Sequence, residues 1–141
     1  EDMLNRQSGL LGVSGLSNDS RNVCEAAAQG HYRAGLAIRI LVHGIKKYIG
    51  AYVAEMNGID ALVFTAGIGE NDAGLRRQVC AGMDYLGIAL DEGANSSLPR
   101  GEAGDISAPG ARVRTFVIPT DEEYMIAQDT ETLAKSVIHS H

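Results

Sequence analysis

The stretch ALVFTAGIGEND, from Ala61 to Asp72, contains the pattern that decides how this sequence folds. Its first four residues form a short apolar run without alternation, which is typical of a strand covered on both faces in a parallel sheet. Two closely spaced glycines then mark a tight connection. A helical pattern follows from Asn71 to Leu86, and Gly87 stands in the usual stop position. The stretch therefore predicts a strand, a glycine-rich loop and a helix in succession.

A second unit of the same kind lies near the end of the chain. The run VRTFVI, Val113 to Ile118, predicts a strand, and a helical segment follows from Asp121 to about Val137. If both strands belong to one parallel sheet, their loops lie at its carboxyl edge, where open α/β sheets bind ligands. Two strands cannot cover the apolar faces of all the predicted helices, so we expect further strands from outside this sequence.

The remaining segments are assigned from composition and periodicity. Residues 1–18, rich in glycine, serine and asparagine, predict a surface loop, and a helix is expected from Asp19 to Gly30. Residues 31–57 predict a long helix with an unusually broad apolar stripe, as expected of a helix that is buried or shared with a partner. Residues 87–112 mix glycine, proline, serine and acids, and they are predicted to be mainly loop.

Composition limits the function classes that need consideration. With 141 residues the chain suits a single domain, and its net charge of −6 argues against a nucleic-acid surface or an anionic membrane. No apolar run approaches the ~20 residues that a membrane-spanning helix requires. Cys24 and Cys80 lack metal-ligand spacing and are expected to be reduced thiols. We expect a cytoplasmic protein whose partner is a small molecule or another protein, without nucleic acid and without a membrane.

The segment TAGIGEN is the first of three that could carry chemistry. Gly67 and Gly69 admit backbone conformations and a close approach that side chains would block, and the start of the next helix favours an anion such as phosphate. The alternative is a structural turn in which Glu70 or Asn71 caps that helix. From this segment alone both interpretations stay open, because it is neither a Walker A loop nor a GxGxxG motif.

The other two segments are IPTDEE and SNDSRN. In the first, Thr120 is expected to cap the last helix and Glu123 to complete a capping box, which leaves Glu122 available to hold Mg²⁺ or one of its waters. Judged alone, this motif is explained mainly by capping. In the second, Arg21 stands on the first turn of a helix, where the helix dipole disfavours a cation. A ribose, an adenine face or a phosphate would compensate, whereas a surface arginine is the plainer interpretation.

Four segments together resemble the acetate kinase family, which includes the propionate and butyrate kinases. They are LNRQSGLLGVSGLSNDSR, ALVFTAGIGEN, LGIALD and VIPTDEEYMIAQDT, and they occur in the order and at the spacing of that family. Family members are much longer, and this chain resembles their C-terminal third. The resemblance implies an α/β, ribonuclease-H-like domain of the actin and sugar-kinase superfamily, with an incomplete sheet flanked by helices. Residues 1–141 would then be the C-terminal part of a nucleotide-binding kinase domain, with the N-terminal domain absent.

The resemblance also implies an enzyme that uses ATP to phosphorylate acetate or a similar short-chain carboxylate, giving an acyl phosphate and ADP, with Mg²⁺. The family's GIGEN segment contacts the nucleotide and its DxR segment lines the adenosine pocket. Carried over, the nucleotide-binding residues are Asp19, Ser20, Arg21, Gly67, Ile68, Gly69, Glu70 and Asn71. The family's magnesium-linked glutamate corresponds to Glu122. Three positions depart from the family's usual residues: Asp121 replaces asparagine, Asn22 replaces aspartate, and Ser20 replaces a larger apolar residue.

The family's catalytic residues precede the matched segment, so no catalytic residue is assigned in this chain and the chain alone is expected to be inactive. The resemblance further implies a homodimer of the intact enzyme. An alternative of another class is a non-catalytic binding or dimerisation module that uses the helix at 31–57 as its surface. ADP distinguishes the two, because it would leave the thermal midpoint of a pure association module unchanged.

Overall fold

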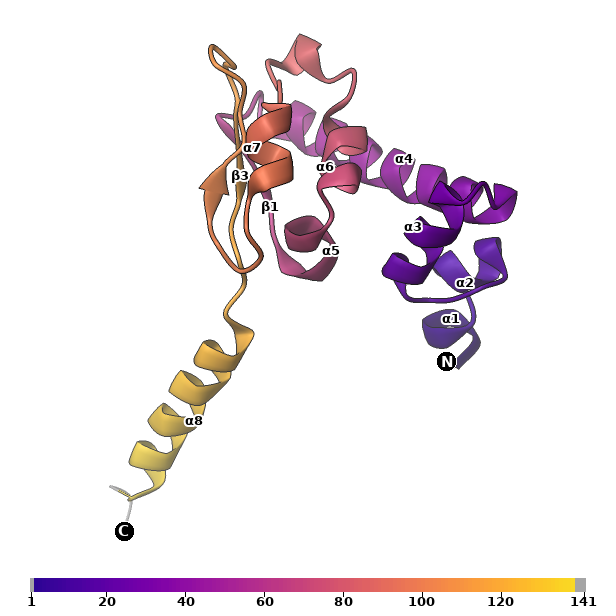
Figure 1. Ribbon diagram of the computed structural model, residues 1–141. Helices are drawn as coiled ribbons and strands as arrows, with labels where there is room; N and C mark the ends of the chain where they lie inside the picture. Colours follow the sequence, from indigo (N-terminus) through magenta and orange to yellow (C-terminus); the bar gives the residue numbers. More distant parts are fainter. Residues whose placement is uncertain (1, 139–141) are drawn as a thin grey trace.

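A small mixed sheet organises the second half of the chain in the computed structural model, which describes residues 2–138 (Figure 1). β1 (Ala61–Phe64) and β3 (Arg114–Val117) are parallel neighbours, and β2 (Gly104–Asp105) pairs antiparallel with the other side of β3. The two strands predicted from the sequence are therefore confirmed, and they are parallel as expected. Their carboxyl ends meet at one edge of the sheet.

One face of the sheet is packed and the other is open. Phe64 and Val117 are buried under the helices, whereas Val63 is 45% exposed on the opposite face of β1. The unalternated sequence of β1 predicted cover on both faces. Within residues 2–138 that prediction is wrong for β1, because no described element covers the face that carries Val63.

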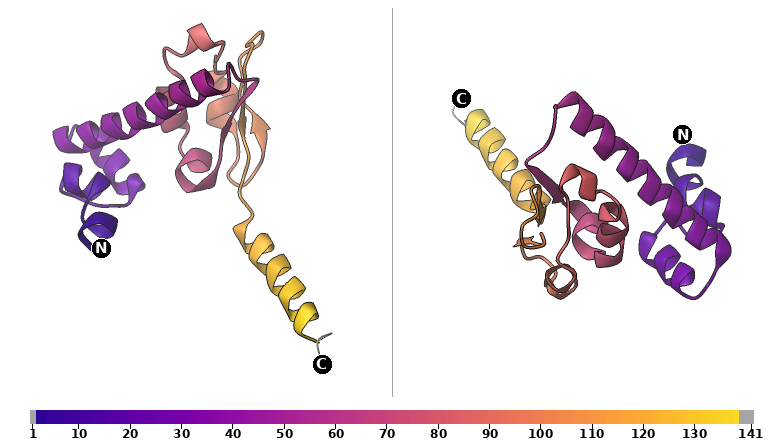
Figure 2. Two further views of the ribbon diagram at one scale, coloured as in Figure 1. Left: turned by 180° about the vertical axis from the view of Figure 1, so that it is seen from behind. Right: turned by 90° about the horizontal axis from the view of Figure 1, so that it is seen from above.

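The long helix predicted at 31–57 is confirmed as α4 (Tyr32–Glu55). His31 caps its N-terminus, because a ring nitrogen of His31 accepts a hydrogen bond from the Ala34 N–H. It joins the two halves of the chain, running from the N-terminal helices past α6 (Ala73–Cys80) to the turn before β1 (Figure 2). Its first half packs against α2 (Gly9–Ser14) and the predicted helix α3 (Ser20–Ala28). The buried residues of α4 are Ala34, Ala37, Ile38 and Val42. Large apolar side chains are also exposed: Ile40 in the first half of α4, Tyr48 and Tyr52 in the second half, and Met56 just after the helix.

Two segments predicted as loops contain regular structure. Residues 1–18 form α1 (Asp2–Arg6) and α2, which ends at Gly15 in the left-handed conformation, with φ of 71°. Residues 87–112 contain α7 (Glu92–Ser97) as well as β2. The Asp91 carboxylate caps α7 by accepting from the Ala94 N–H at 2.9 Å. At α7 this capping outweighs the poor helix propensity of glycine and serine, on which the loop prediction depended.

The single helix predicted from Asn71 to Leu86 is wrong. Residues 66–86 instead form two short helices, α5 (Ala66–Asn71) and α6, followed by a short 3₁₀ turn, η1 (Asp84–Leu86). The chain leaves helical geometry at Asp72, whose carboxylate accepts from the Leu75 N–H at 2.8 Å and caps α6. The GIGEN residues therefore lie in a short helix rather than in a loop before one.

The last helix, α8 (Glu122–Ile138), extends away from the rest of the chain in all views (Figures 1 and 2). Its N-terminal turn is capped by Asp121, whose carboxylate accepts from the Tyr124 N–H at 3.0 Å. The predicted capping box of Thr120 and Glu123 is therefore wrong. No helix within residues 2–138 combines the length and the hydropathy needed to cross a membrane.

Candidate functional site

The turn from β1 into α5 is sharp because one residue adopts an unusual backbone conformation. Ala66, the first residue of α5, has φ of 57°, in the left-handed region that costs an L-residue roughly 1–2 kcal/mol. The turn places α5 directly at the carboxyl end of β1. The Asn71 side chain closes the short helix by donating to the Gly67 carbonyl at 2.8 Å.

A cavity of about 390 Å³ lies between this short helix and the start of α3. Ligand pockets of roughly 300–1,000 Å³ are typical for small molecules. The structure thus brings together the SNDSRN and TAGIGEN segments, which are far apart in the sequence. The cavity is lined by Ser20, Arg21, Gly67, Ile68, Asn71, Asp72 and Arg100.

The two glycines of GIGEN were expected to provide unusual backbone conformations and a close approach to a ligand. Neither residue has the left-handed backbone that only glycine adopts freely, so that part of the prediction is wrong. Gly67 lines the cavity, and a Cβ added there would meet no atom within 4 Å. Gly69 is buried, and its added Cβ would contact the Phe64 backbone at 3.5 Å. Gly67 therefore leaves space toward the cavity, whereas Gly69 is buried against β1 with room for no more than an ordinary van der Waals contact.

Arg21 is held by an acidic neighbour. The Asp19 carboxylate caps α3 by accepting from the Arg21 N–H at 2.9 Å, and it also accepts from Nη2 of Arg21 at 2.6 Å. The side-chain hydrogen bond from Arg21 lowers the pKa of Asp19 below its usual value. Asp19 therefore explains why a cation is tolerated at the start of α3, and no ligand is needed to explain it.

Asp72 connects the two walls of the cavity. One oxygen of its carboxylate caps α6, and the other accepts from the Cys24 thiol at 3.4 Å. Burial of Cys24 and, to a smaller extent, its hydrogen bond to Asp72 raise the pKa of this thiol to about 11. Cys24 and Cys80 are both free, as the sequence predicted.

Glu70 points away from the cavity and joins the two loops at the carboxyl edge. Its Oε1 accepts from the backbone N–H of Thr120 at 2.8 Å and from the Thr120 hydroxyl at 3.1 Å.

Five of the eight predicted nucleotide-binding residues line the cavity, and Asp19, Gly69 and Glu70 are the three that do not. Glu122 is the first residue of α8, and its side chain lies outside the described part. Within that part no three His, Cys, Asp or Glu side chains gather to hold a metal ion.

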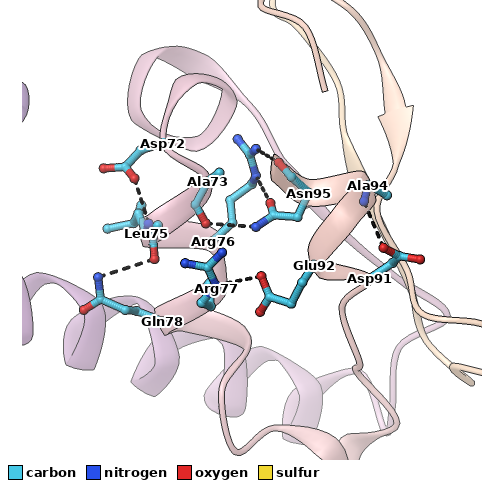
Figure 3. Close-up of polar contacts among 11 residues, drawn as sticks. Asp72, Ala73, Leu75, Arg76, Arg77, Gln78, Asp91, Glu92, Ala94 and Asn95 are labelled. Atoms are coloured by element: carbon cyan, nitrogen blue, oxygen red, sulfur yellow. Dashed lines mark hydrogen bonds and ion pairs between the residues drawn. The ribbon is translucent and has the colours of Figure 1, made fainter. Parts of the chain in front are cut away.

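A buried arginine, Arg76, makes hydrogen bonds to Asn95 of α7 (Figure 3). Arg76 is 2% exposed, and its Nη1 donates to the carbonyls of Gly69 and Glu70 at 2.9 and 2.8 Å. Its Nε and Nη2 donate to the side-chain and backbone oxygens of Asn95, at 2.7 and 3.0 Å. The Asn95 amide in turn donates to the Ala73 carbonyl at 3.0 Å. We call Arg76 and Asn95 the arginine clamp, because together they join α5, α6 and α7.

The clamp satisfies groups that a short helix leaves without partners. The last carbonyls of a helix have no intrahelical donor, and those of Gly69 and Glu70 belong to the end of α5. Burial lowers the pKa of the Arg76 guanidinium, while the Asp72 carboxylate acts in the opposite direction. An arginine remains charged in either case. The clamp therefore holds α5 in place with a cation whose hydrogen bonds, in the described part, all go to neutral oxygens.

Comparison with known proteins identifies the family of this chain. The model of the acetokinase family matches residues 1–128, so the chain belongs to this family. The acetate kinase of Moorella thermoacetica is 55% identical over 136 residues, which are 96% of this chain and 34% of that protein. The acetate kinase of Methanosarcina acetivorans is 51% identical over 138 residues, or 98% of this chain and 33% of that protein.

Solved structures agree with this assignment. A crystal structure of Porphyromonas gingivalis acetate kinase matches with a TM-score of 0.84 at 47% identity. The match covers 94% of this chain and 33% of the chain in that structure. A crystal structure of a propionate kinase from Francisella tularensis matches with a TM-score of 0.80 at 42% identity. The match covers 90% of this chain and 32% of the chain in that structure. The chain spans about a third of the length of the relatives it matches.

The clamp can be tested in a hybrid enzyme, defined as Moorella thermoacetica acetate kinase with its matching segment replaced by residues 1–141. Arg76→Met leaves the carbonyls of Gly69, Glu70 and Asn95 without a donor, and we expect the free energy of unfolding to fall by about 3–5 kcal/mol. Urea titration measures this change.

Arg77→Met is the matched control for the clamp. Arg77 is the next residue, and it makes a half-exposed ion pair with Glu92 at 2.6 Å. Exposed pairs contribute about 1 kcal/mol or less, so this variant should unfold at nearly the same urea concentration as the parent. Equal losses for Arg76 and Arg77 would contradict the role of the clamp.

Proposed function

We propose that this chain is the nucleotide-binding, C-terminal third of an enzyme that transfers the γ-phosphoryl group of ATP to a short-chain carboxylate. The observation that carries this proposal is the cavity in which the SNDSRN and TAGIGEN segments meet, since both are the segments expected to contact the nucleotide. Membership of the acetokinase family supports the kinase over a module that only binds or associates. The fold proposed for the intact enzyme is the ribonuclease-H-like fold of the actin superfamily.

The two loops at the carboxyl edge are proposed to bind different parts of the nucleotide and its Mg²⁺. The nucleoside is proposed to occupy the cavity beside Ser20, Arg21 and Ile68, with its phosphates directed toward the ends of β1 and β3. The hydrogen bonds between Glu70 and Thr120 hold the start of α8 next to the GIGEN segment. Because Asp121 is engaged in capping α8, Glu122 is the carboxylate of this connection that we assign to Mg²⁺. Mg²⁺ typically binds one or two carboxylates together with substrate phosphates, whose charge it would neutralise.

The rest of the enzyme is proposed to supply the acyl pocket and the catalytic groups. Phosphoryl transfer depends on positioning and on neutralising charge over the transferred group. In this chain Arg21, which lines the cavity, is paired with Asp19, and Arg76 is buried beneath α5, so we assign both to the nucleoside end. The preference among acetate, propionate and butyrate is then set outside residues 1–141.

We also propose that two copies of the intact enzyme associate through the second half of α4. Tyr48 and Tyr52 are 60% and 61% exposed, and their ring centroids are 6.4 Å apart. Tyrosine side chains of this kind are enriched in interfaces because they combine a large apolar ring with a polar group. The surface lies on the helix that the sequence predicted to be shared with a partner.

Activity tests the assignment as a whole. The hybrid enzyme should form acyl phosphate from ATP and acetate, trapped as the hydroxamate, whereas residues 1–141 alone should not. Glu122→Gln in the hybrid should lower turnover and raise the Mg²⁺ concentration required, because one anionic oxygen ligand is lost. Glu123→Gln, at the next position of α8, is the control and should be mild. Turnover by residues 1–141 alone, or equal effects of the two glutamine variants, would contradict the proposal.

Gly67→Ala should separate nucleotide binding from stability. The new methyl group would point into open space at the cavity, and alanine within α5 is more favourable than glycine by up to ~1 kcal/mol. We therefore expect an unchanged or slightly higher thermal midpoint for the hybrid, with ADP affinity reduced at least tenfold in calorimetry. Gly50→Ala, a helix-interior glycine of α4 that also faces open space, is the matched control. Undiminished ADP affinity in Gly67→Ala would place the nucleotide elsewhere.

The association surface has its own test. Replacing Tyr48 and Tyr52 together by aspartate puts two charges into the proposed interface, and light scattering should then show the hybrid as a monomer. Tyr85→Asp serves as the control, since Tyr85 is equally exposed but lies on η1. A dimer that persists in the double variant would rule out this surface.

A further inference from the structure

One wall of the cavity is not explained by either family segment. Arg100 lines the cavity together with Ser20, Arg21 and Ile68, but it comes from the connection between α7 and β2. The sequence predicted mainly loop in this region. Within residues 2–138 the structure gives the Arg100 guanidinium no hydrogen bond and no ion pair, so it is available to a ligand.

The backbone that carries Arg100 is well anchored. Asn95, in the arginine clamp, fixes α7 to α6. Leu98 packs against the hydrophobic core and contacts Gly104 so closely that an added Cβ on this glycine would collide with it. Pro99 then restricts the backbone just before the arginine. Arg100 is thus presented at a defined place from which its long side chain reaches the cavity.

The charges around the cavity indicate which part of a nucleotide Arg100 contacts. Arg21 is neutralised by Asp19, and the carboxylate of Asp72 remains in the wall beside Arg100. With Asp19 offsetting Arg21 and Asp72 standing beside Arg100, this end of the cavity has no excess of positive charge to attract phosphate groups. An uncharged aromatic base suits it better, because the planar guanidinium of arginine stacks on aromatic faces and Ile68 adds an apolar contact.

We propose that Arg100 binds the nucleotide by packing its guanidinium against the face of the base, and that it does not bind the phosphates. This inference rests on the proposed nucleotide site, and it adds a third segment, the α7–β2 connection, to the two that the family motifs mark. Arg100 is then a base-binding residue of the cavity, held in position by the clamp.

The test compares nucleotide fragments in the hybrid enzyme. Calorimetry measures the affinities of adenosine and ADP for the parent, Arg100→Ala and Arg100→Lys at low and high salt. Loss of one stacking contact should weaken the binding of both ligands by the same factor, on the order of tenfold, with little dependence on salt. Lysine keeps the charge but lacks the planar group, so Arg100→Lys should not restore affinity.

Arg112→Ala is the matched control, because Arg112 is an exposed arginine near the opposite, amino end of β3. Its affinities should equal those of the parent. If Arg100→Ala weakens ADP but not adenosine, or if lysine restores binding, Arg100 contacts phosphate and the inference is overturned. Unchanged affinity in Arg100→Ala also overturns it while leaving the proposed function intact. If the folded parent hybrid binds no ADP, the proposed function fails and this inference fails with it.

Discussion

The buried guanidinium of Arg76 is the interaction on which the candidate site depends. An isolated charge in a protein interior costs many kcal/mol unless polar groups surround it. Here the carbonyl oxygens of Gly69, Glu70 and Asn95 and the side-chain oxygen of Asn95 accept its hydrogen bonds. The carbonyls at the end of α5 are also the negative end of a helix dipole, which favours a cation. One residue therefore satisfies the end of α5 and fixes α7 at the same time.

The long elements of the fold could be predicted from the sequence, because their signals are local. The apolar periodicity of α4 and the apolar runs of β1 and β3 each lie within one element, and the structure confirms all three. At α5, α6 and α7 the short helices were missed or merged because a single capping carboxylate decides the outcome. Asp72 ends one helix and begins the next, and Asp91 starts α7 in a segment whose composition resembles a loop.

The candidate site was predictable only in the parts that the family segments mark. Those segments identified Ser20, Arg21, Gly67, Ile68 and Asn71, which the structure brings to one cavity. Arg76, Asn95 and Arg100 were missed for a physical reason. Arg76 and Asn95 are 19 residues apart and meet only after α6 and α7 have packed, and Arg100 reaches the cavity only because that packing positions its loop. The capping aspartates Asp72 and Asp91 were the available signal that regular structure interrupts this region.

The chain exposes more surface than a compact monomer of its mass. A compact monomer of 14.9 kDa should expose about 7,000 Å² by the usual scaling of area with mass. This chain exposes 9447 Å². The excess is larger than the roughly 1,600 Å² buried in a standard protein interface. Exposed large apolar side chains include Val63 on the open face of β1, Tyr48 and Tyr52 on α4, and Tyr124, Met125, Ile126 and Leu133 on α8. The cavity between α3 and α5 is separate from these surfaces, because its lining residues come from α3, from α5, from Asp72 after α5 and from the α7–β2 connection.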